Sequence, residues 1–342
     1  MSNGLGFART PVRDRPVRAA IVGAGAFGRL HARAFAARDD VELAAVVDTD
    51  VARARAVADE AGALAAASLD DVLVGGRLDA VSVVVGGAGR VELAEAALEA
   101  GCAVLVEKPV ATTAAGARRL AARAERTGEF VMPAHILRFA EPYRAVHDRV
   151  RSGETGPVAR MEFHRHRGAD HDRRFADVHP VLMTMVHDID LAIWLGGPTP
   201  SLADAVVTAT AVREPGRAQP AAVQASVTWP GGPVWEFDVS WRLGPEDDAP
   251  DVLRVEGPTG AVGLDLGDLR RVGVTGIGPE SAWLAPPDGG GALGAEVAEF
   301  VTAVRTGTLP TTVSIDDAVR GLELAEAVIA AARTAAAVGG RA

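Results

Sequence analysis

The chain has 342 residues and a mass of 35.2 kDa, a size that favours two packed domains over a single core. Apolar residues make up 48% and charged residues 23%, which excludes disorder along the whole chain. The net charge of −10 provides no chain-wide basic field for a phosphate backbone, so nucleic acid is not an expected partner.

The N-terminal residues and the cysteine content bear on the cellular compartment in which the protein is expected. Cys102 is the only cysteine, so an intramolecular disulfide and an all-cysteine zinc site are both excluded. Residues 1–16 are polar, arginine-bearing and broken by prolines, and we expect a mobile tail rather than a targeting segment. Apolar runs such as 78–87 are too short to cross a bilayer, so no membrane contact is expected. These features predict a cytoplasmic protein.

Residues 17–136 alternate between short apolar runs and helical patterns. Runs that read as strands buried on both faces are RAAIV, VELAAVV, LDAVSVVV, AVLVE and EFVMPAH. Helical patterns separate them, including 51–61 and 113–127. This alternation predicts an α/β domain with a doubly wound parallel sheet over 17–136.

Residues 137–342 have a different pattern. Strands follow one another with turn signals between them, and in PVWEFDVSW the apolar residues Trp235, Phe237 and Trp241 alternate with polar ones. Helical stretches flank these strands, at 181–195 and after residue 294. We expect an α+β domain with an open, mainly antiparallel sheet, whose apolar face packs against helices or against a partner subunit.

A glycine motif follows the first predicted strand. Gly23, Gly25 and Gly28 stand between a strand and a helix, where they allow a tight turn, close approach of a pyrophosphate and helix packing. Asp48, twenty residues after Gly28, ends the second strand and is placed to bind ribose hydroxyls. A carboxylate there disfavours a 2′-phosphate, so NAD is the predicted cofactor. NADP remains an alternative because Arg53 or Arg55 can reach such a phosphate.

Lys108 stands out by composition. The other 34 basic residues are all arginine, so this lysine is unique in the chain. Arginine stays protonated at any working pH, whereas a buried ammonium can release its proton. Lys108 is therefore the first catalytic candidate, against the alternative of a chance survivor on the surface.

Glu107-Lys108-Pro109 then carries a resemblance. The segments that support it are GAGAFG, RFAEPYRAVHDRVRSGETGPV, HDIDLAIWL and AEFVTAVRTG. Together with this motif they resemble the Gfo/Idh/MocA oxidoreductases, the glucose-fructose oxidoreductase and inositol dehydrogenase group. The resemblance extends over nearly the whole chain. The resemblance implies a Rossmann domain at 17–136 and a substrate-binding and oligomerisation domain at 137–342. It also implies dimers or tetramers joined through the C-terminal sheets.

The same resemblance assigns the site residues. Lys108 is implied as the catalytic lysine that touches nicotinamide ribose and substrate, and His187 as the general acid and base. His187 also fits a buried core position, because it shares a helical face with Leu191 and Trp194. The predicted cofactor-binding residues are Gly23, Gly25, Ala26, Phe27, Gly28, Asp48, Thr49, Gly86, Glu107 and Lys108.

Two positions depart from the family pattern. Met183 stands where inositol dehydrogenase-like members carry an aspartate one turn before the histidine, and methionine cannot hold an imidazole tautomer. His179 and Asp177 are candidate substitutes. Arg90, at the end of VGGAGR, replaces a family histidine in a loop that approaches the cofactor in relatives.

The segment 164–180 is rich in histidine, arginine and aspartate and predicts contacts to substrate, with a solvated loop as the equal alternative. Residues near the end of the last parallel strand add to this set, while Tyr143 is better explained as a core or surface aromatic. The predicted substrate-binding residues are His135, Arg138, Arg165, Arg167, His179 and Met183.

No metal site is predicted. His164 and His166 share one face of a strand and would need His171 or Asp172 to complete a divalent cation site, which is a weak signal.

Together these features predict an NAD(P)-dependent enzyme that interconverts a secondary alcohol and a ketone on a sugar, cyclitol or related polyol. One alternative is glycoside cleavage with NAD recycled in place, and another is a non-catalytic sensor that binds NAD. The resemblance implies a homodimer or homotetramer.

Overall fold

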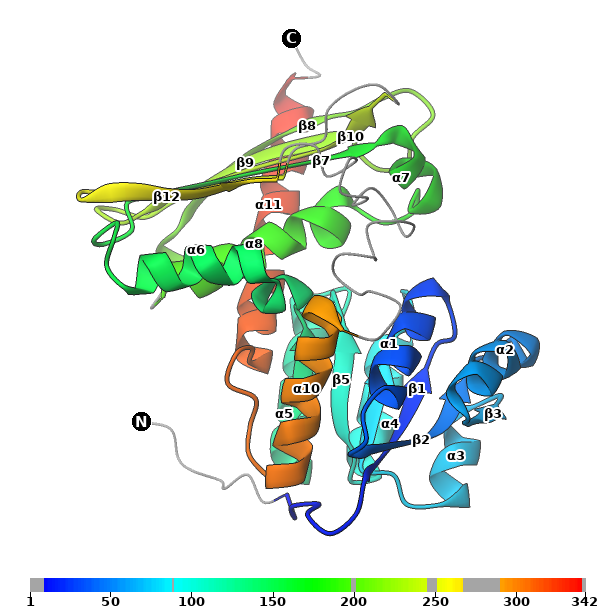
Figure 1. Ribbon diagram of the computed structural model, residues 1–342. Helices are drawn as coiled ribbons and strands as arrows, with labels where there is room; N and C mark the ends of the chain where they lie inside the picture. The colour runs from blue at the N-terminus through cyan, green and yellow to red at the C-terminus, as the bar shows by residue number, and fades with distance from the viewer. Residues whose placement is uncertain (1–8, 88, 198–200, 245–250, 267–289, 340–342) are drawn as a thin grey trace. The chain divides into compact units, whose positions relative to one another are not determined.

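The computed structural model describes residues 9–339 except 88, 198–200, 245–250 and 267–289, and the chain forms two compact units (Figure 1). The first unit contains residues 9–139 together with 290–319. The second contains the described residues from 140 to 266 and from 320 to 339. The sequence pattern placed everything after residue 136 in one domain, whereas the structure groups 290–319 with the first unit.

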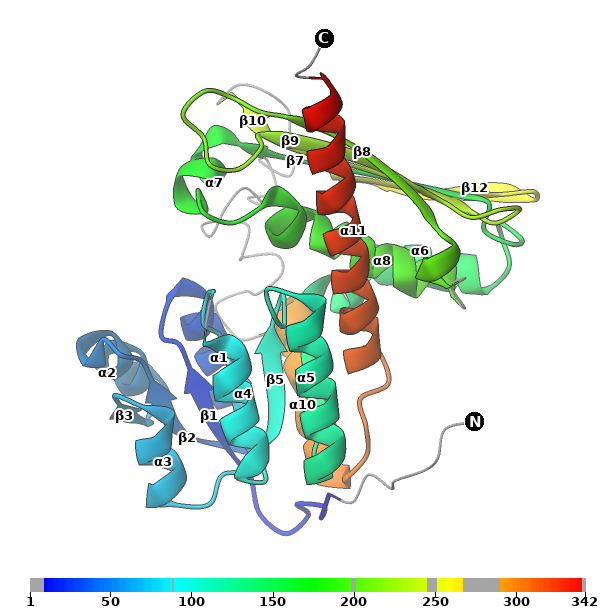
Figure 2. The same ribbon diagram turned by 180° about the vertical axis from the view of Figure 1, so that it is seen from behind.

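The first unit is built on a six-stranded parallel sheet. Its strands are β1 (Val17–Val22), β2 (Val41–Val47), β3 (Leu64–Ala66), β4 (Ala80–Val83), β5 (Ala103–Glu107) and β6 (Val131–Ala134). Its helices are α1 (Ala26–Ala36), α2 (Val51–Ala61), α3 (Leu69–Gly75), α4 (Arg90–Glu99), α5 (Ala114–Thr127), η1 (Ile136–Phe139) and α10 (Gly291–Thr306). The strand order is β3-β2-β1-β4-β5-β6, so the chain reverses direction across the sheet between β1 and β4. Helices α1 and α10 cover one face and α4 and α5 the other (Figures 1 and 2).

Local sequence explains these elements. Every residue of β4 and β5 is buried, as expected for strands covered on both faces. Asp50, Ser68 and Thr113 each accept a hydrogen bond from a backbone N–H in the first turn of α2, α3 and α5. Strand β3 has three residues and was not predicted, because so short a run carries no readable periodicity.

Helix α10 belongs with the first unit because of its aromatic contacts. The Phe300 ring lies 6.1 Å from Phe35 and 5.7 Å from Phe130, both in edge-on geometry, and Phe300 is fully buried. These partners are separated from Phe300 by more than 150 residues of sequence. Helical periodicity predicts α10 itself but contains no information about where it packs.

Residues 9–16 were expected to form part of a mobile tail, but they pack against the first unit. The buried Arg9 pairs with Glu129 and donates to the carbonyl of Asp79 at 2.7 Å. Arg15 donates to both oxygens of Asp79, and Val12 is 8% exposed. The polar composition that suggested a tail provides these ion pairs. Residues 1–8 lie outside the described part of the chain.

The second unit is built on a mixed, mainly antiparallel sheet. Its strands are β7 (Arg160–Gly168), β8 (Val206–Val212), β9 (Ala222–Thr228), β10 (Val234–Leu243), β11 (Asp251–Gly257) and β12 (Gly260–Asp265). Its other elements are α6 (Glu141–Arg151), α7 (Ala169–Arg174), η2 (Val181–Met185), α8 (Val186–Gly196), η3 (Leu202–Asp204) and α11 (Ile315–Gly339), which enters this unit at Arg320. The strand order is β12-β11-β7-β10-β9-β8, and only β7 and β10 pair in parallel. No helix among the described residues is long and apolar enough to cross a membrane.

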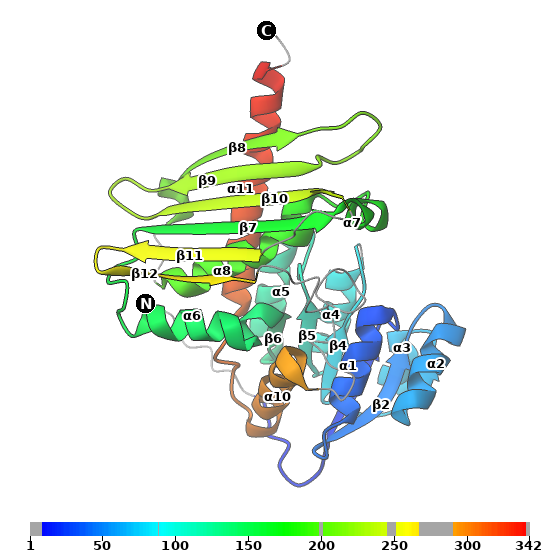
Figure 3. The ribbon, with the colours of Figure 1, turned by 45° about the horizontal axis from the view of Figure 1, so that its top comes forward.

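The two faces of this sheet differ in polarity. In β10 the side chains of Trp235, Phe237, Val239 and Trp241 are buried, and those between them are half-buried. Trp241 donates its indole N–H to Thr184 Oγ1 of η2 at 3.0 Å, so the apolar face packs on helices of its own chain. The half-buried Glu236 and Asp238 of β10 point to the opposite face. Figure 3 views the sheet with α8 and α11 behind it.

Candidate functional site

The glycine-rich turn lies between β1 and α1, and its three glycines meet different constraints. A Cβ on Gly23, whose φ is +103°, would lie 2.4 Å from the carbonyl oxygen of Val84. A Cβ on Gly28 would lie 1.8 Å from the carbonyl oxygen of Gly23. Both glycines are therefore required by the protein's own packing. A Cβ on Gly25 would meet nothing within 4 Å, so the space beside it is open to a ligand.

The N-terminus of α1 begins at this turn. Its N-cap is Gly25, which makes no side-chain capping bond, and the first turn holds no acidic residue. Ala26 is exposed and Phe27 half-buried. The first N–H groups of a helix have no partner within the helix, so this end offers donors and positive dipole to phosphate oxygens.

Asp48 follows β2 and faces the turn. Its Oδ2 accepts a hydrogen bond from the Ala24 N–H at 2.8 Å, and its Oδ1 accepts one from the Asp50 N–H at 2.9 Å. Two carboxylate oxygens have about four lone-pair positions, so acceptor capacity remains for ribose hydroxyls. Arg53 pairs with Asp50 at 3.0 Å and lies 3.7 Å from Asp48. Thr49, next in the chain, is exposed.

Lys108 is the first residue after β5, and its turn is held by two buried side chains. The Lys108 N–H donates to Oε2 of the buried Glu107 at 3.1 Å, and Lys108 itself is partly exposed. The guanidinium of Arg90 is buried, and its Nε donates to the Val85 carbonyl at 2.8 Å. Another of its nitrogens, Nη1, donates to the Pro109 carbonyl. Arg90 therefore ties the loop after β4, which carries the exposed Gly86, to the turn that carries Lys108.

Glu107 also ends a buried chain of polar groups. His31 Nε2 lies 3.1 Å from Glu107 Oε1, and His31 Nδ1 lies 3.0 Å from Ser82 Oγ. The carboxylate can only accept, so Nε2 carries the proton and Nδ1 accepts from the serine hydroxyl. Glu296 of α10 is fully buried in the same cluster.

These features fit a dinucleotide. The open side of Gly25, the uncapped end of α1 and the Asp48 carboxylate all stand at the carboxyl ends of neighbouring parallel strands, where such sheets bind nucleotides. The space beside Gly25 and the uncapped end of α1 suit a pyrophosphate, and the Asp48 carboxylate suits a ribose.

Comparison with known proteins agrees with this geometry. The sequence profile of the GFO_IDH_MocA family, described as an oxidoreductase family with an NAD-binding Rossmann fold, matches residues 17–135. The profile of the GFO/IDH/MocA C-terminal domain matches 143–262, and together the two cover more than half of the chain. The chain belongs to the Gfo/Idh/MocA family.

Individual Gfo/Idh/MocA relatives are dehydrogenases by name. An inositol 2-dehydrogenase of Corynebacterium glutamicum is 28% identical over 187 residues, which are 54% of this chain and 55% of the relative. A D-glucoside 3-dehydrogenase of Escherichia coli is 33% identical over 44% of this chain and 43% of the relative. The chain thus spans about half the length of the curated relatives it matches. The crystal structure of GenD2 from gentamicin A biosynthesis, in complex with NAD, is 26% identical, covers 96% of this chain and 97% of that one, and has a TM-score of 0.80.

The fold and the cofactor predicted for this Gfo/Idh/MocA chain are thereby confirmed: its first domain is an NAD-binding Rossmann domain. His135 and Arg138 belong to the same unit, and both are buried. Arg138 donates to the Thr312 carbonyl at 2.9 Å and pairs with Asp317 at 3.1 Å. Those contacts give Arg138 a structural role that the sequence did not predict.

The predicted residues of the second unit begin with His187, the second residue of α8. It is partly exposed, although Val186, Asp188 and Ile189 beside it are buried. Met183 is also partly exposed and lies in η2, which has the wider turn of a π-helix. Single-turn π segments are frequent at functional sites. The roles of His187 and Met183 remain predictions.

Arg165 and Arg167 form ion pairs within the second unit, and their predicted contacts to substrate stay a prediction. Arg165 is 4% exposed, and its Nε and Nη2 donate to the buried Asp188 at 3.0 and 2.7 Å. It also pairs with Asp251, to which Arg167 donates with both terminal nitrogens. The Tyr143 hydroxyl, 3.3 Å from Arg165 Nη2, belongs to this cluster, and burial raises the pKa of Tyr143 to about 12. Two guanidiniums against two carboxylates leave the cluster electrically balanced.

His179 precedes η2 and is 8% exposed. Its Nδ1 accepts a hydrogen bond from the Val181 N–H at 3.2 Å. Burial lowers the pKa of His179 to about 4, and the charges of Arg333 and Arg213 act in the same direction. The ring is therefore neutral at pH 7. Asp177, the other candidate substitute for the missing family aspartate, is exposed.

Sequence reasoning missed several groups of the site. His31 was not singled out, although its position three residues after Gly28 on a helix predicted to pack on the sheet was a usable signal. Asp188 and Asp251 lie 23 and 86 residues from Arg165, and a single sequence contains no signal for such pairs.

Proposed function

We propose that this protein is an NAD-dependent dehydrogenase that interconverts a secondary alcohol and a ketone on a sugar, a cyclitol or a related polyol. The observation that carries the proposal is the turn after β5, where the only lysine of the chain follows the buried Glu107 at the carboxyl edge of a nucleotide-binding sheet. The names of the relatives support the substrate class, since they include dehydrogenases of an inositol and of a glucoside.

The chemistry needs an acid-base group and a cation. NAD supplies the acceptor for the hydride of the oxidised carbon. We assign proton removal from the substrate hydroxyl to His187, because an imidazole titrates near neutral pH. The Lys108 ammonium stabilises the negative charge that develops on the substrate oxygen. Both assignments rest on the family motif.

Buried polar side chains hold the main chain of the turn that carries Lys108. Its main chain is bonded to Glu107, and Arg90 donates to the carbonyl of the next residue, Pro109. A main chain held in place limits the positions that the ammonium can reach, and the less a charged group has to reorganise in the transition state, the more it contributes to catalysis. We expect NAD to be preferred over NADP, because the Asp48 carboxylate would repel a 2′-phosphate.

A substrate screen tests the proposal. Absorbance of the reduced cofactor is followed with NAD and with NADP against free sugars, sugar phosphates, nucleotide sugars and inositols. Reduction of NAD by a member of this panel is the expected result, and Lys108→Ala should abolish it while NAD binding persists. Arg118→Ala, in α5 of the same unit, is the matched control. Faster turnover with NADP would contradict the cofactor preference.

Two other activities predict different outcomes of the same screen. A glycoside-cleaving enzyme that recycles NAD would release sugar without net NADH, and Lys108→Ala would still abolish turnover. A sensor would bind NAD and ligand without turnover, and Lys108→Ala would leave ligand binding intact. We also expect a homodimer or homotetramer, which a monomeric mass by light scattering at micromolar concentration would contradict.

A further inference from the structure

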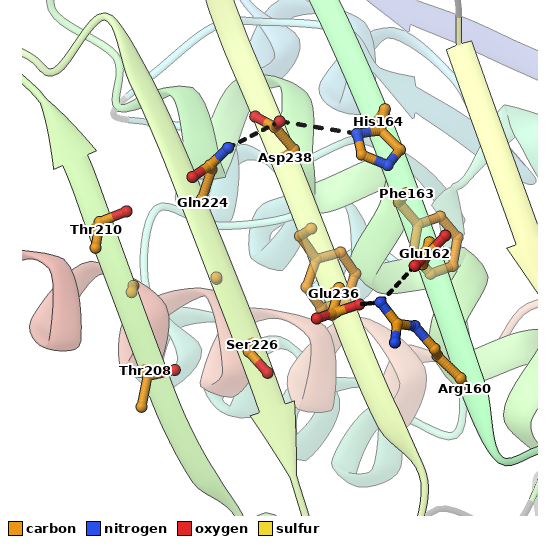
Figure 4. Close-up of a pocket in the computed structure, with 13 residues that line it drawn as sticks. Arg160, Glu162, Phe163, His164, Thr208, Thr210, Gln224, Ser226, Glu236 and Asp238 are labelled. Carbon is orange, nitrogen blue, oxygen red and sulfur yellow. Dashed lines mark hydrogen bonds and ion pairs between the residues drawn. The ribbon is translucent and has the colours of Figure 1, made fainter.

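The outer face of the C-terminal sheet carries a cluster that the function proposed above does not use. His164 and His166 alternate along β7, so both side chains stand on the same face. Asp238 lies directly opposite His164 on β10, which pairs with β7 in parallel. Figure 4 shows Asp238 and His164 directed toward one another across the two strands, at one end of a hollow of about 430 Å³.

The distances in this cluster suit metal ligands better than hydrogen bonds. His164 Nδ1 lies 3.7 Å from Asp238 Oδ2, and His166 Nε2 lies 3.5 Å from Asp238 Oδ1. Hydrogen bonds of this kind are normally about 2.7–3.2 Å long. Ligands at about 2.0–2.1 Å around a tetrahedral zinc ion are separated by about 3.3–3.5 Å. All three potential ligand atoms lie within 4.8 Å of one another.

His166 Nε2 provides a second, independent observation. This atom is shielded from solvent, and its contact with Asp238 Oδ1, at 3.5 Å, does not meet hydrogen-bond geometry, so among the described residues no hydrogen bond satisfies it. A buried nitrogen without a partner is costly, so protein structures normally satisfy it with a polar group, a water or an ion. The lone pair of a neutral imidazole beside a carboxylate is the donor that zinc prefers.

Neighbouring side chains support the carboxylate. Gln224 of β9 donates its side-chain N–H to Asp238 Oδ2 at 3.1 Å, which fixes the orientation of the carboxylate. Glu162 and Glu236, next along the same face, are both paired with Arg160 (Figure 4). The negative charge of Asp238 is therefore directed to the two histidines.

We propose that His164, His166 and Asp238 form a binding site for Zn²⁺ on the outer face of this sheet. Three protein ligands leave a fourth position for water or an external group. The sequence offered His171 or Asp172 as the third ligand, but the His171 ring packs edge-on against Trp241, with 5.1 Å between the ring centroids, and the side chain of Asp172 lies outside the described set. Asp238, 72 residues beyond His166, takes that place.

The test measures zinc directly and is independent of enzyme activity. The full-length protein is stripped of metal with EDTA and titrated with Zn²⁺ in competition with a chromogenic chelator. We expect one zinc per chain, and at least tenfold weaker binding in His164→Ala, His166→Ala and Asp238→Asn. Co²⁺ in place of zinc should show the intense visible bands of four-coordinate geometry, and these should be lost in the same variants.

His171→Ala is the matched control, since this histidine follows β7 closely and is absent from the cluster. It should bind zinc like the parent protein. Thermal unfolding and NAD binding of each variant separate loss of a ligand from loss of the fold. A parent protein that binds no zinc would overturn the proposal, and so would zinc binding that is weakened by His171→Ala but not by Asp238→Asn.

Discussion

His31 Nε2 lies 3.1 Å from Glu107 Oε1, a contact between residues 76 positions apart that joins the first helix to the strand before Lys108. The His31 side chain is fully buried, and its other nitrogen contacts Ser82 of β4. The contact orients the carboxylate whose second oxygen accepts the Lys108 N–H. A buried histidine on α1 thus positions the turn that carries the catalytic candidate.

Replacing His31 should therefore affect stability and turnover together. In His31→Ala both Glu107 and Ser82 lose a buried partner and a cavity forms, so we expect the free energy of unfolding to fall by about 3 kcal/mol. Ser82→Ala removes only the hydroxyl at the far end of this buried chain, so it should lower the free energy of unfolding by less than His31→Ala does. Urea unfolding monitored by circular dichroism, with kcat measured on each variant, provides the test. Parental kcat in His31→Ala would show that the contact between His31 and Glu107 does not position the turn that carries Lys108.

Arg90 gives a second prediction, because its guanidinium bonds to two carbonyls in different loops. Arg90→Ala leaves the carbonyls of Val85 and Pro109 without this donor, which should lower stability by about 2 kcal/mol and reduce kcat/KM about tenfold. Arg90→Lys keeps the charge but lacks the planar fork, so it should rescue only part of the loss.

The control for Arg90 is Arg119→Ala. Arg119 forms ion pairs with Glu92 and Glu95 of the neighbouring helix at the protein surface, where water and salt screen them, so their loss should change stability little. Stability is read from the midpoint of denaturant unfolding and kcat/KM from initial rates with NAD. If Arg90→Ala kept the parental kcat/KM, Arg90 would not position the turn that carries Lys108.

These residues show what a single sequence can and cannot predict. Gly23, Gly25 and Gly28 were identified because a turn between a strand and a helix is a local feature with a known steric reason. Arg90 was noted as a departure, but its two acceptors are set by packing between loops. The Arg165 pair with Asp251, the site of α10 and the position of Asp238 depend on contacts between distant segments. Periodicity describes each segment separately, so it contains no signal for them.

A pH prediction follows from His179. Its pKa is about 4 in the folded protein and about 6.5 in the unfolded chain, so between these values the unfolded state binds more protons. Stability contributed by the neutral ring is fully present above about pH 6.5 and is lost as the pH falls toward 4. The upper limit of this loss is about 3 kcal/mol, from the size of the pKa shift.

The measurement compares unfolding free energies at pH 7.5 and pH 5 for the parent protein and His179→Gln. Glutamine does not titrate, so the variant should lose less stability on acidification. Because carboxylates also titrate in this range, the informative quantity is the difference between the two proteins. Parallel pH profiles would mean that His179 has an ordinary pKa.

The last prediction separates packing from ligand binding within the glycine motif. Gly25 has φ of −66°, which any residue adopts, and a Cβ there meets no protein atom within 4 Å. Gly25→Ala should therefore leave the unfolding midpoint unchanged but weaken NAD binding about tenfold or more, because the methyl group occupies the space of the pyrophosphate. In Gly28→Ala the methyl group meets the Gly23 carbonyl, so this variant should be destabilised or fail to fold. Calorimetric titration with NAD measures the affinity of both variants, and thermal unfolding measures their stability. Parental NAD affinity in Gly25→Ala would place the phosphates elsewhere, since no other property of that position changes.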